Sequence, residues 1–267
     1  MSDLPNRRYE EMSAGYMAGC DTRDWIAVLP LGATEQHGPH LPPETDWMIA
    51  DGIVSKTLSI MPAGLPVTFL PTEKVGYSRE HSNRPGAISL SYDVAISRWI
   101  EIGENLADRG IRKLVLLNAH GGNSPLMTIV ATELRARRHM LAVVTSWTRF
   151  GVPPGVVSPE EKAHGIHGGE IETSVMLALH PELVRMDEAR DFPSLQTEME
   201  RNTKHLRAYG PHAFGWMATD LNPKGVVGHA KKATADQGVR LIAHAAEGFV
   251  ELLEDIHAFD VTRFDRE

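Results

Sequence analysis

The sequence predicts an α/β fold: a single three-layer α/β/α domain over residues 1–267, with a mostly parallel sheet. Short apolar runs alternate along the chain with amphipathic stretches of helical length. The run at 114–117 is apolar at every position, which is typical of a parallel strand covered on both faces. No repeat, low-complexity tract or linker divides the chain, so we expect one domain.

Apolar runs of strand length predict the sheet, with strands at 25–29, 66–70, 114–117 and 141–145. Amphipathic or capped stretches predict helices at 47–58, 91–109, 170–180 and 234–259. A further helix is predicted from Ser124 onward, with Ser124 as its N-cap. In the last helix Thr234 and Gln237 form a capping box. The stripe that this helix turns inward is predicted as Val239, Ile242, Ala246, Phe249, Val250, Leu253 and Ile256.

Two stretches have no helical or strand period. Residues 72–87 are polar and rich in Gly and Pro, which predicts a loop. Residues 187–223 carry mixed charge, and a lid, an oligomer arm or an irregular excursion would fit them equally.

The composition excludes several classes of protein. The chain is 42% hydrophobic and 23% charged, as in ordinary globular proteins. Its one cysteine, Cys20, excludes an intrachain disulfide and a multi-cysteine metal site. A net charge of −8 argues against nucleic acid or an anionic membrane as the main partner. No run approaches the ~18 apolar residues of a membrane span, and MSDLPNRRYEEM lacks the apolar stretch of a signal peptide. We therefore expect a cytoplasmic protein.

Three metal-ligand side chains follow the first predicted strand within twelve positions: Glu35, His37 and Asp46. In extended chain, residues i and i+2 point the same way, so Glu35 and His37 can enter one pocket. Asp46 opens the next helix and can return a carboxylate to that pocket. Carboxylates can bridge divalent ions, and imidazole suits zinc, manganese or iron. The alternative to a metal site is a polar turn whose side chains cap a helix. His40 either supports the metal ligands without binding metal itself or is simply a loop residue.

Two more clusters of possible metal ligands follow a predicted strand or begin a predicted helix. Ligands of parallel sheets usually bind at such positions. His120 follows the run 114–117 beside two glycines, and a glycine-rich turn with a buried histidine is an equal alternative. The segment 164–174 joins His164 and His167 to Glu170 and Glu172. Acids at a helix start also complement the helix dipole, which accounts for one of these two glutamates without any metal.

Together these motifs resemble the creatininase family, also called creatinine amidohydrolases. The resemblance rests on residues 32–42 with Thr45-Asp46, on 118–123 and on 167–174, in family order within roughly residues 8–255. It implies an α/β/α hydrolase with two divalent metal ions (zinc, manganese or iron). Such enzymes act mainly on carbon–nitrogen bonds, other than peptide bonds, of small molecules, and are often homo-oligomers, in particular hexamers.

The resemblance also assigns roles residue by residue. Glu35, Asp46 and His120 would hold one metal, and His37 with a bridging Asp46 would hold the other. His167 matches a proposed proton shuttle, and Ser78 matches a serine that contacts substrate. His164, in the loop 151–166, is expected to contribute to substrate binding.

The chain departs from the family pattern at two places. Creatininases carry a glutamate ligand at the position of Gly122, so the second metal needs another ligand, for which we favour Glu170 and leave Glu172 an acid–base role. They also carry a tryptophan that closes over substrate, whereas residues 162–166 contain no aromatic side chain. Creatinine is therefore a doubtful substrate.

These observations predict an amidohydrolase that cleaves a cyclic amide, a formamide or a related compound with metal-activated water. The alternatives are creatinine amidohydrolase itself and relatives that deformylate pyrimidine precursors, trim a peptide or open a cyclic inositol ketone. A non-catalytic oligomer stabilised by metal is a rival of a different class. Structural zinc sites are usually closed by thiolates, which this sequence lacks, so the rival is disfavoured.

Overall fold

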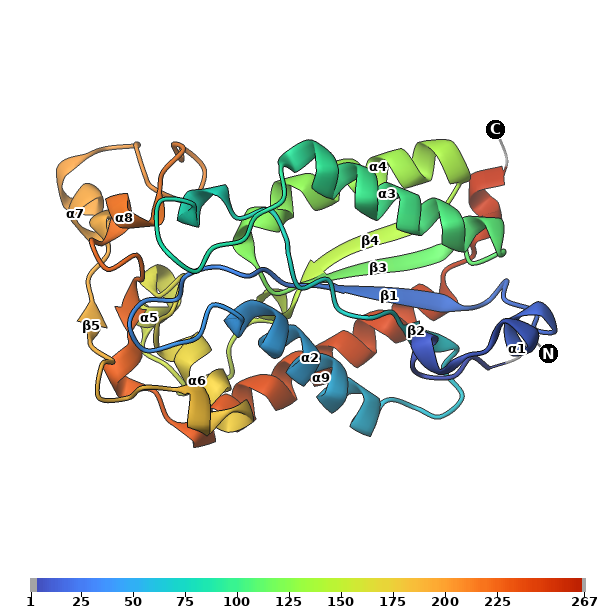
Figure 1. The fold of residues 1–267 in the computed structure, drawn as a ribbon, viewed down its shortest axis with the longest axis horizontal. Coiled ribbons are helices and arrows are strands. Elements are labelled where there is room, and N and C mark those ends of the chain that lie inside the picture. The colour runs from blue at the N-terminus through green and yellow to red at the C-terminus, as the bar shows by residue number, and fades with distance from the viewer. Residues whose placement is uncertain (1–3, 266–267) are drawn as a thin grey trace.

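The computed structural model describes residues 4–265. Within these residues the main sheet is entirely parallel, with the strand order β2-β1-β3-β4 (Figure 1). Its strands are β1 (Ile26–Leu31), β2 (Val67–Phe69), β3 (Lys113–Asn118) and β4 (Leu141–Ser146). All four coincide with apolar runs of the sequence, and the predicted α/β fold with a mostly parallel sheet is confirmed.

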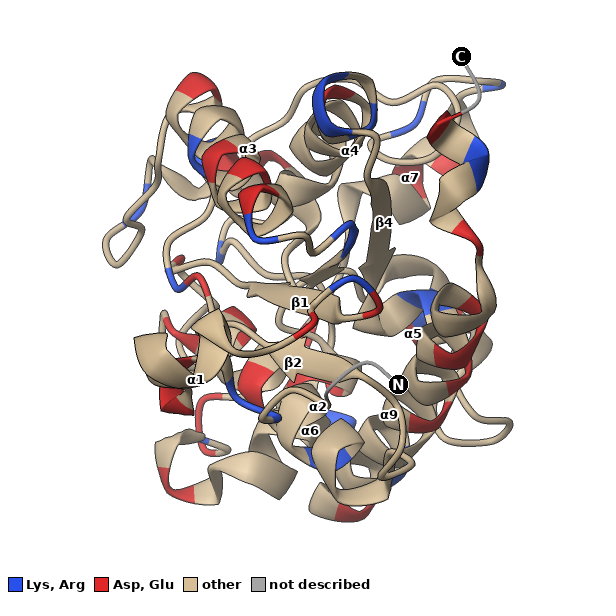
Figure 2. Ribbon diagram, turned by 90° about the vertical axis from the view of Figure 1, so that its right-hand side faces the viewer, with Lys and Arg blue, Asp and Glu red and all other residues tan. Residues whose placement is uncertain are grey.

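Helices cover both faces of this sheet, as Figure 2 shows from the side: α3 and α4 lie on one face, and α2, α6 and α9 on the other. The helices are α1 (Ala14–Ala18), α2 (Thr45–Ile60), α3 (Tyr92–Asp108), α4 (Ser124–Arg138), α5 (Pro159–His164), α6 (Glu170–Leu179), α7 (Leu195–Asn202), α8 (Ala218–Leu221) and α9 (Ala235–Ala258). Successive side chains of β3 alternate between the two layers: Leu114 and Leu116 enter the core beneath α3 and α4, whereas Val115 and Leu117 enter the other core.

Helix ends agree with the sequence to within a few residues. The capping box is confirmed, since Thr234 Oγ1 accepts from the Gln237 amide while Gln237 Oε1 accepts from the Thr234 amide. The N-cap of α4 is Asn123, not Ser124, because a 3₁₀ turn runs directly into the helix and Ser124 already has helical φ and ψ. The predicted stripe of α9 was wrong at Val239, which is 58% exposed, because the buried face runs through Gly238, Leu241 and Ile242.

The packing of α6 against α9 depends on one glycine. A Cβ at Gly238 would lie 1.9 Å from the carbonyl oxygen of Ser174, so only glycine permits this approach. Because α6 carries Glu170 and Glu172, the contact fixes the position of both glutamates relative to the sheet.

Residues 187–223 pack at the carboxyl end of the sheet (Figure 1). They include α7, α8 and β5 (Asp191–Phe192), and β5 pairs with β6 (Gly228–His229) in a small antiparallel sheet. A small core of Met199, Ala208, Leu221 and Val227 holds the segment in place. The excursion is therefore folded over the end of the sheet at which the predicted site lies. Among residues 4–265, no helix combines the length and the apolar character needed to cross a bilayer.

Candidate active site

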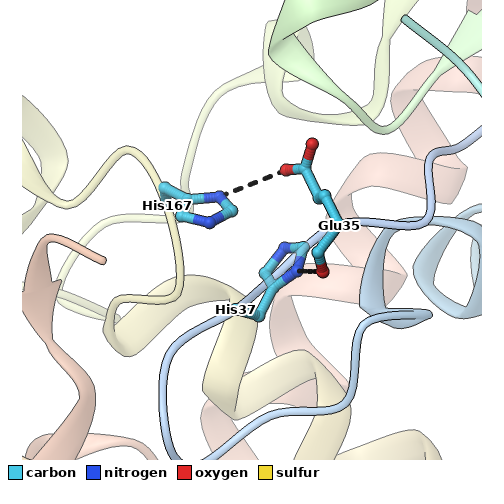
Figure 3. A group of neighbouring side chains, drawn as sticks. All are labelled: Glu35, His37 and His167. Carbon is cyan, nitrogen blue, oxygen red and sulfur yellow. Dashed lines mark hydrogen bonds and ion pairs between the residues drawn. The ribbon is translucent and has the colours of Figure 1, made fainter. Parts of the chain in front are cut away.

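Four of the five predicted ligands come from three separate parts of the chain and meet at the carboxyl end of the sheet, and the fifth, Glu170, does not join them. Glu35 and His37 follow β1, Asp46 lies in the first turn of α2, and His120 follows β3. Glu172 reaches the same place from the first turn of α6. Figure 3 shows the Glu35 and His37 side chains beside the ring of His167.

His37 is oriented by a backbone hydrogen bond. Its Nδ1–H donates to the carbonyl oxygen of Glu35 at 3.1 Å (Figure 3). The other nitrogen, Nε2, then carries the lone pair of the neutral ring. It lies 3.1 Å from Asp46 Oδ1 and 3.7 Å from Glu172 Oε2. An imidazole held in this way by a carbonyl presents its free nitrogen as metal ligands do.

His120 repeats the arrangement with its nitrogens exchanged. Nε2–H donates to the carbonyl oxygen of Tyr77 at 2.8 Å, which leaves the lone pair on Nδ1. Nδ1 lies 3.2 Å from Glu35 Oε2 and also 3.2 Å from Asp46 Oδ2. The two oxygens of Asp46 thus face different imidazoles, one oxygen toward His37 and the other toward His120.

The arrangement fits divalent metal ions. Among the described residues, His37 Nε2 and Asp46 Oδ2 are buried and have no hydrogen-bond partner, which is costly unless another group engages them. Ligand atoms of Glu35, Glu80 and His120 lie within 4.8 Å of one another, as do those of His37, Asp46 and Glu172. Carboxylate and imidazole donors of this kind suit zinc, manganese and iron.

The buried carboxylates shift the pKa values of the site strongly. Burial lowers the pKa of His37, but the charge and hydrogen bonding of Asp46 outweigh it and raise the pKa to about 9. Burial likewise opposes protonation of His120, whose pKa nevertheless lies well above its ordinary value because of Glu35 and Asp46. Desolvation raises the pKa of Glu172 to about 7. The pocket therefore favours positive charge at its centre.

His167 lies between two other imidazole rings at the edge of this cluster. Its ring centroid is 4.3 Å from that of His37 and 4.3 Å from that of His81. Nε2–H donates to the carbonyl oxygen of Gln36 at 2.9 Å, and Nδ1 lies 3.5 Å from Glu35 Oε1. Burial and the neighbouring imidazoles hold the pKa of His167 well below its ordinary value. The ring is thus neutral, with its lone pair facing the cluster.

His81 was not predicted as a site residue. Gln36 fixes its tautomer: Gln36 Oε1 accepts from the Gly38 amide, so its Nε2 carries two hydrogens, directed at the Gly225 carbonyl oxygen and at His81 Nδ1. His81 Nδ1 is therefore the acceptor, and Nε2–H faces Glu35 Oε1 at 3.3 Å. Burial and the nearby imidazoles lower the pKa of His81 to about 3. The only signal in the sequence was its place in the same short motif as Ser78.

Three predicted residues lie elsewhere than expected. Ser78 is fully buried behind Glu35 and donates to Glu35 Oε2 at 2.5 Å, so it orients that carboxylate. His164 does not line the cavity that opens onto the cluster, and its Nε2 is 3.4 Å from Glu200 Oε2. Glu170 does not join the cluster either, because its Oε1 accepts from Gln237 Nε2 at 2.7 Å.

The phase of α6 explains why Glu172, rather than Glu170, meets His37. The helix begins at Glu170, so the two glutamates lie in its first turn and diverge by roughly 200° around the axis. Glu172 Oε2 accepts from the Gly168 amide at 2.6 Å and faces His37. The two side chains leave opposite sides of the helix, one toward the site and one toward α9.

A cavity of about 400 Å³ opens onto the cluster. Its polar wall includes Glu35, Glu80, His120 and His167, and its aromatic wall consists of Phe214 and Trp216. These aromatic side chains come from the excursion 187–223. That excursion therefore forms part of the site wall.

Comparison with known proteins agrees with this geometry. The family described as creatininase, or creatinine amidohydrolase, matches residues 10–253. The mycofactocin precursor peptide peptidase of Mycobacterium tuberculosis is 33% identical, over 81% of this chain and 79% of that protein. The creatinine amidohydrolase of Pseudomonas putida is 31% identical, over 69% of this chain and 74% of that protein.

A solved structure of creatininase with manganese superposes with a TM-score of 0.74 at 25% identity, covering 96% of this chain and 100% of that one. The family includes hydrolases of carbon–nitrogen bonds other than peptide bonds, such as creatinine amidohydrolase, so the predicted enzyme class is confirmed. The fold, the cluster of ligands and these matches agree, and the chain belongs to the creatininase family of metal-dependent hydrolases.

Proposed function

We propose that the protein is a binuclear metal-dependent amidohydrolase that cleaves a C–N bond in a small cyclic amide, a formamide or a related compound. The observation that carries the proposal is the position of Asp46. Its two carboxylate oxygens face the lone-pair nitrogens of His37 and His120, and Oδ2 is buried without a hydrogen-bond partner among the described residues. A carboxylate in this position can bridge two cations.

Two sets of ligands share Asp46 in this proposal. Glu35 and His120 complete one set, and His37 and Glu172 complete the other. Divalent ions held there supply Lewis-acid chemistry and lower the pKa of a bound water. The metals proposed are zinc, manganese or iron, because each accepts mixed carboxylate and imidazole ligands.

In this proposal His167 transfers a proton from the attacking water to the leaving nitrogen. Because its Nε2–H is bonded to Gln36, proton uptake and release take place at Nδ1, which faces the cluster and the cavity. A neutral imidazole can accept a proton from water and deliver it to the leaving nitrogen of the substrate. His81 and Ser78 hold Glu35 from both sides and keep its carboxylate in place.

The cavity suits a small substrate. Its volume of about 400 Å³ lies near the lower end of the range for small-molecule sites. Phe214 and Trp216 offer flat apolar surface on which a planar amide or a heterocycle can stack. Cleavage of a short peptide is the second candidate, since the M. tuberculosis relative is described as a precursor peptide peptidase.

The test is metal analysis of the purified protein followed by a substrate panel of cyclic amides, formamides, lactones and short peptides. We expect metal-dependent hydrolysis of an amide or formamide, abolished by chelation and restored by zinc or manganese. Exclusive cleavage of peptides would favour the second candidate. Hydrolysis that survives complete removal of metal would contradict the proposal.

We also propose that the enzyme assembles as a homo-oligomer, specifically a hexamer, as the family resemblance implies. Sedimentation equilibrium at micromolar concentration tests this directly. A monomer under these conditions would rule it out.

A further inference from the structure

Glu80 lines the same cavity as Glu35 and His120 but lies at the other edge of the His120 ring. His120 Nδ1 faces Glu35 and Asp46, whereas Glu80 Oε1 is 3.5 Å from His120 Nε2. The hydrogen on Nε2 is directed to the carbonyl oxygen of Tyr77, 2.8 Å away, so Glu80 does not accept it. The Glu80 carboxylate therefore belongs to the wall of the cavity and not to the cluster of metal ligands.

No cationic side chain compensates this carboxylate in the described part of the chain. Neither a lysine nor an arginine among residues 4–265 forms an ion pair with Glu80, although its side chain is only 17% exposed. The described residues that line the cavity include no lysine or arginine either. Glu35, the other carboxylate of the wall, is engaged by Ser78 and His120. Burying a carboxylate without a partner is costly, so a positively charged ligand in the cavity would stabilise Glu80.

An aromatic wall accompanies Glu80 in this cavity, formed by Phe214 and Trp216. The indole N–H of Trp216 donates to a backbone carbonyl oxygen at 2.7 Å, which fixes the ring and satisfies its polar edge. The wall is tied to the turn that carries Glu80, because Asn83 Nδ2 donates to Thr219 Oγ1 at 2.8 Å. Aromatic rings attract cations through their faces. One ligand can thus meet a carboxylate and two aromatic rings together.

We propose that Glu80, Phe214 and Trp216 form a subsite for an alkylammonium group on the part of the substrate that is not cleaved. This inference rests on the proposed amidohydrolase function and narrows its substrates to amides that carry a positive charge. The ammonium group lies beside the Nε2 edge of His120. The scissile bond then lies toward the Nδ1 edge, where the ligand sets meet.

The surroundings of Glu80 favour an ammonium over a guanidinium. A Cβ at Gly122 would lie 2.4 Å from Glu80 Oε1, so this oxygen is packed against the glycine and Oε2 is left for a ligand. A single oxygen suits the point charge of an ammonium, whereas the guanidinium fork pairs best with both oxygens of a carboxylate. Glycine at 122 also keeps the subsite intact, because a side chain there would displace the Glu80 carboxylate.

The test compares two probes of nearly the same shape, choline and its neutral isostere 3,3-dimethyl-1-butanol. The quaternary nitrogen of choline has no lone pair and cannot bind a metal, so titration calorimetry on the Zn²⁺-loaded protein reports the subsite. We expect the wild type to bind choline about tenfold more tightly than the alcohol or better. Glu80→Gln should bind the two probes with similar affinity. Glu101→Gln, which changes an exposed acid on α3, is the matched control and should keep the preference for choline.

Two results would overturn the inference. One is equal affinity of the wild type for the two probes, and the other is a folded Glu80→Gln that still prefers choline. Circular dichroism checks the fold of the variant. If Glu80→Gln does not fold, Trp216→Leu takes its place and should weaken choline binding severalfold. Unchanged choline binding by a folded Trp216→Leu would then count against the subsite.

A pair of substrates separates this inference from the function on which it rests. N-formyl-1,4-diaminobutane carries an ammonium group that N-formylbutylamine lacks, and the wild type should hydrolyse the charged formamide with the higher kcat/KM. Equal kcat/KM values for the two would overturn the subsite while the amidohydrolase proposal stands. A wild type that prefers choline but hydrolyses no amide would support the subsite and contradict the proposed function.

Discussion

The two ligand sets that share Asp46 are built in different ways. The His37 set takes its other carboxylate from Glu172, at the start of a helix fixed against α9. The His120 set opens onto the cavity of about 400 Å³ and borders Glu80, in a turn between β2 and α3. The first set therefore depends on packing of regular elements, whereas the second depends on a loop that also shapes the substrate site.

Among changes confined to one ligand set, the largest effect is expected when a ligand is removed from the His37 set. Glu172→Gln should lose one metal, and kcat/KM should fall by on the order of 10²–10³-fold, the scale of losing one electrostatic stabiliser of a transition state. Glu170→Gln is the matched control, because its carboxylate faces Gln237 and not the site. Metal titration of both variants checks the prediction. Loss of metal in Glu170→Gln alone would show that Glu170 is the ligand.

A second prediction concerns substrate specificity, which depends on the cavity beside the His120 set. Creatinine should be a poor substrate, with kcat/KM below ~10⁴ M⁻¹s⁻¹ when manganese or zinc is supplied. Gly122 carries no carboxylate, and the aromatic wall comes from Phe214 and Trp216 rather than from residues 162–166. A creatinine assay decides it, and a value in the ordinary enzyme range would refute the prediction.

A third prediction tests how far the His37 set depends on helix packing. Gly238→Ala places a methyl group against the Ser174 carbonyl and should lower the free energy of unfolding by about 3 kcal/mol. It should also weaken binding of the metal held by Glu172, because α6 must move. Gly15→Ala in α1, where a Cβ meets nothing within 4 Å, is the control and should be neutral or stabilising. Denaturant titration measures both, and equal stability of the two variants would contradict the packing argument.

The smallest expected effect concerns His40, which lies in the loop between His37 and Asp46. His40 Nε2 lies 3.1 Å from the carbonyl oxygen of Gly168 and 3.0 Å from Thr173 Oγ1, whereas Nδ1 is buried without a partner among the described residues. Burial lowers the pKa of His40 to about 4. The unfolded chain, with a histidine pKa near 6.5, therefore binds more protons, and stability is lost as the pH falls from about 6.5 to 4.

His40→Gln cannot take up that proton. Relative to its own value at pH 7, metal-free wild type should lose about 2 to 3 kcal/mol more than the variant by pH 4.5. Denaturant titrations in the presence of a chelator measure the free energy of unfolding of the wild type and of His40→Gln, each at pH 7 and at pH 4.5. Parallel losses in the two proteins would exclude His40 as a source of acid sensitivity.

Most of the fold could be predicted from the sequence because its strands are apolar at nearly every position. The alternation of Leu114, Val115, Leu116 and Leu117 between two cores requires layers on both sides of the sheet. The exposure of Val239 could not be predicted so easily, because a broad apolar stripe leaves the phase of a helix uncertain by one residue.

The site was predictable where side chains directly follow strands. Glu35, His37 and His120 meet because the carboxyl ends of parallel strands share one edge of the sheet. Glu80 and His81 lie in an aperiodic loop, whose path is set by tertiary contacts that the sequence does not display.

The choice between Glu170 and Glu172 depended on where α6 begins. An extended start would have allowed both side chains to point the same way, whereas a helix from Glu170 separates them. Helix boundaries are the least certain feature of a sequence-based prediction, and here one boundary decides which glutamate meets His37.

The number of metal ions per chain in the wild type and in Asp46→Asn tests whether one carboxylate serves both ligand sets. After reconstitution with Mn²⁺ or Zn²⁺ and removal of free metal, elemental analysis should give two ions per wild-type chain and well under one per Asp46→Asn chain. One ion in the wild type, or two in Asp46→Asn, would rule out an Asp46 carboxylate that is shared by two metals.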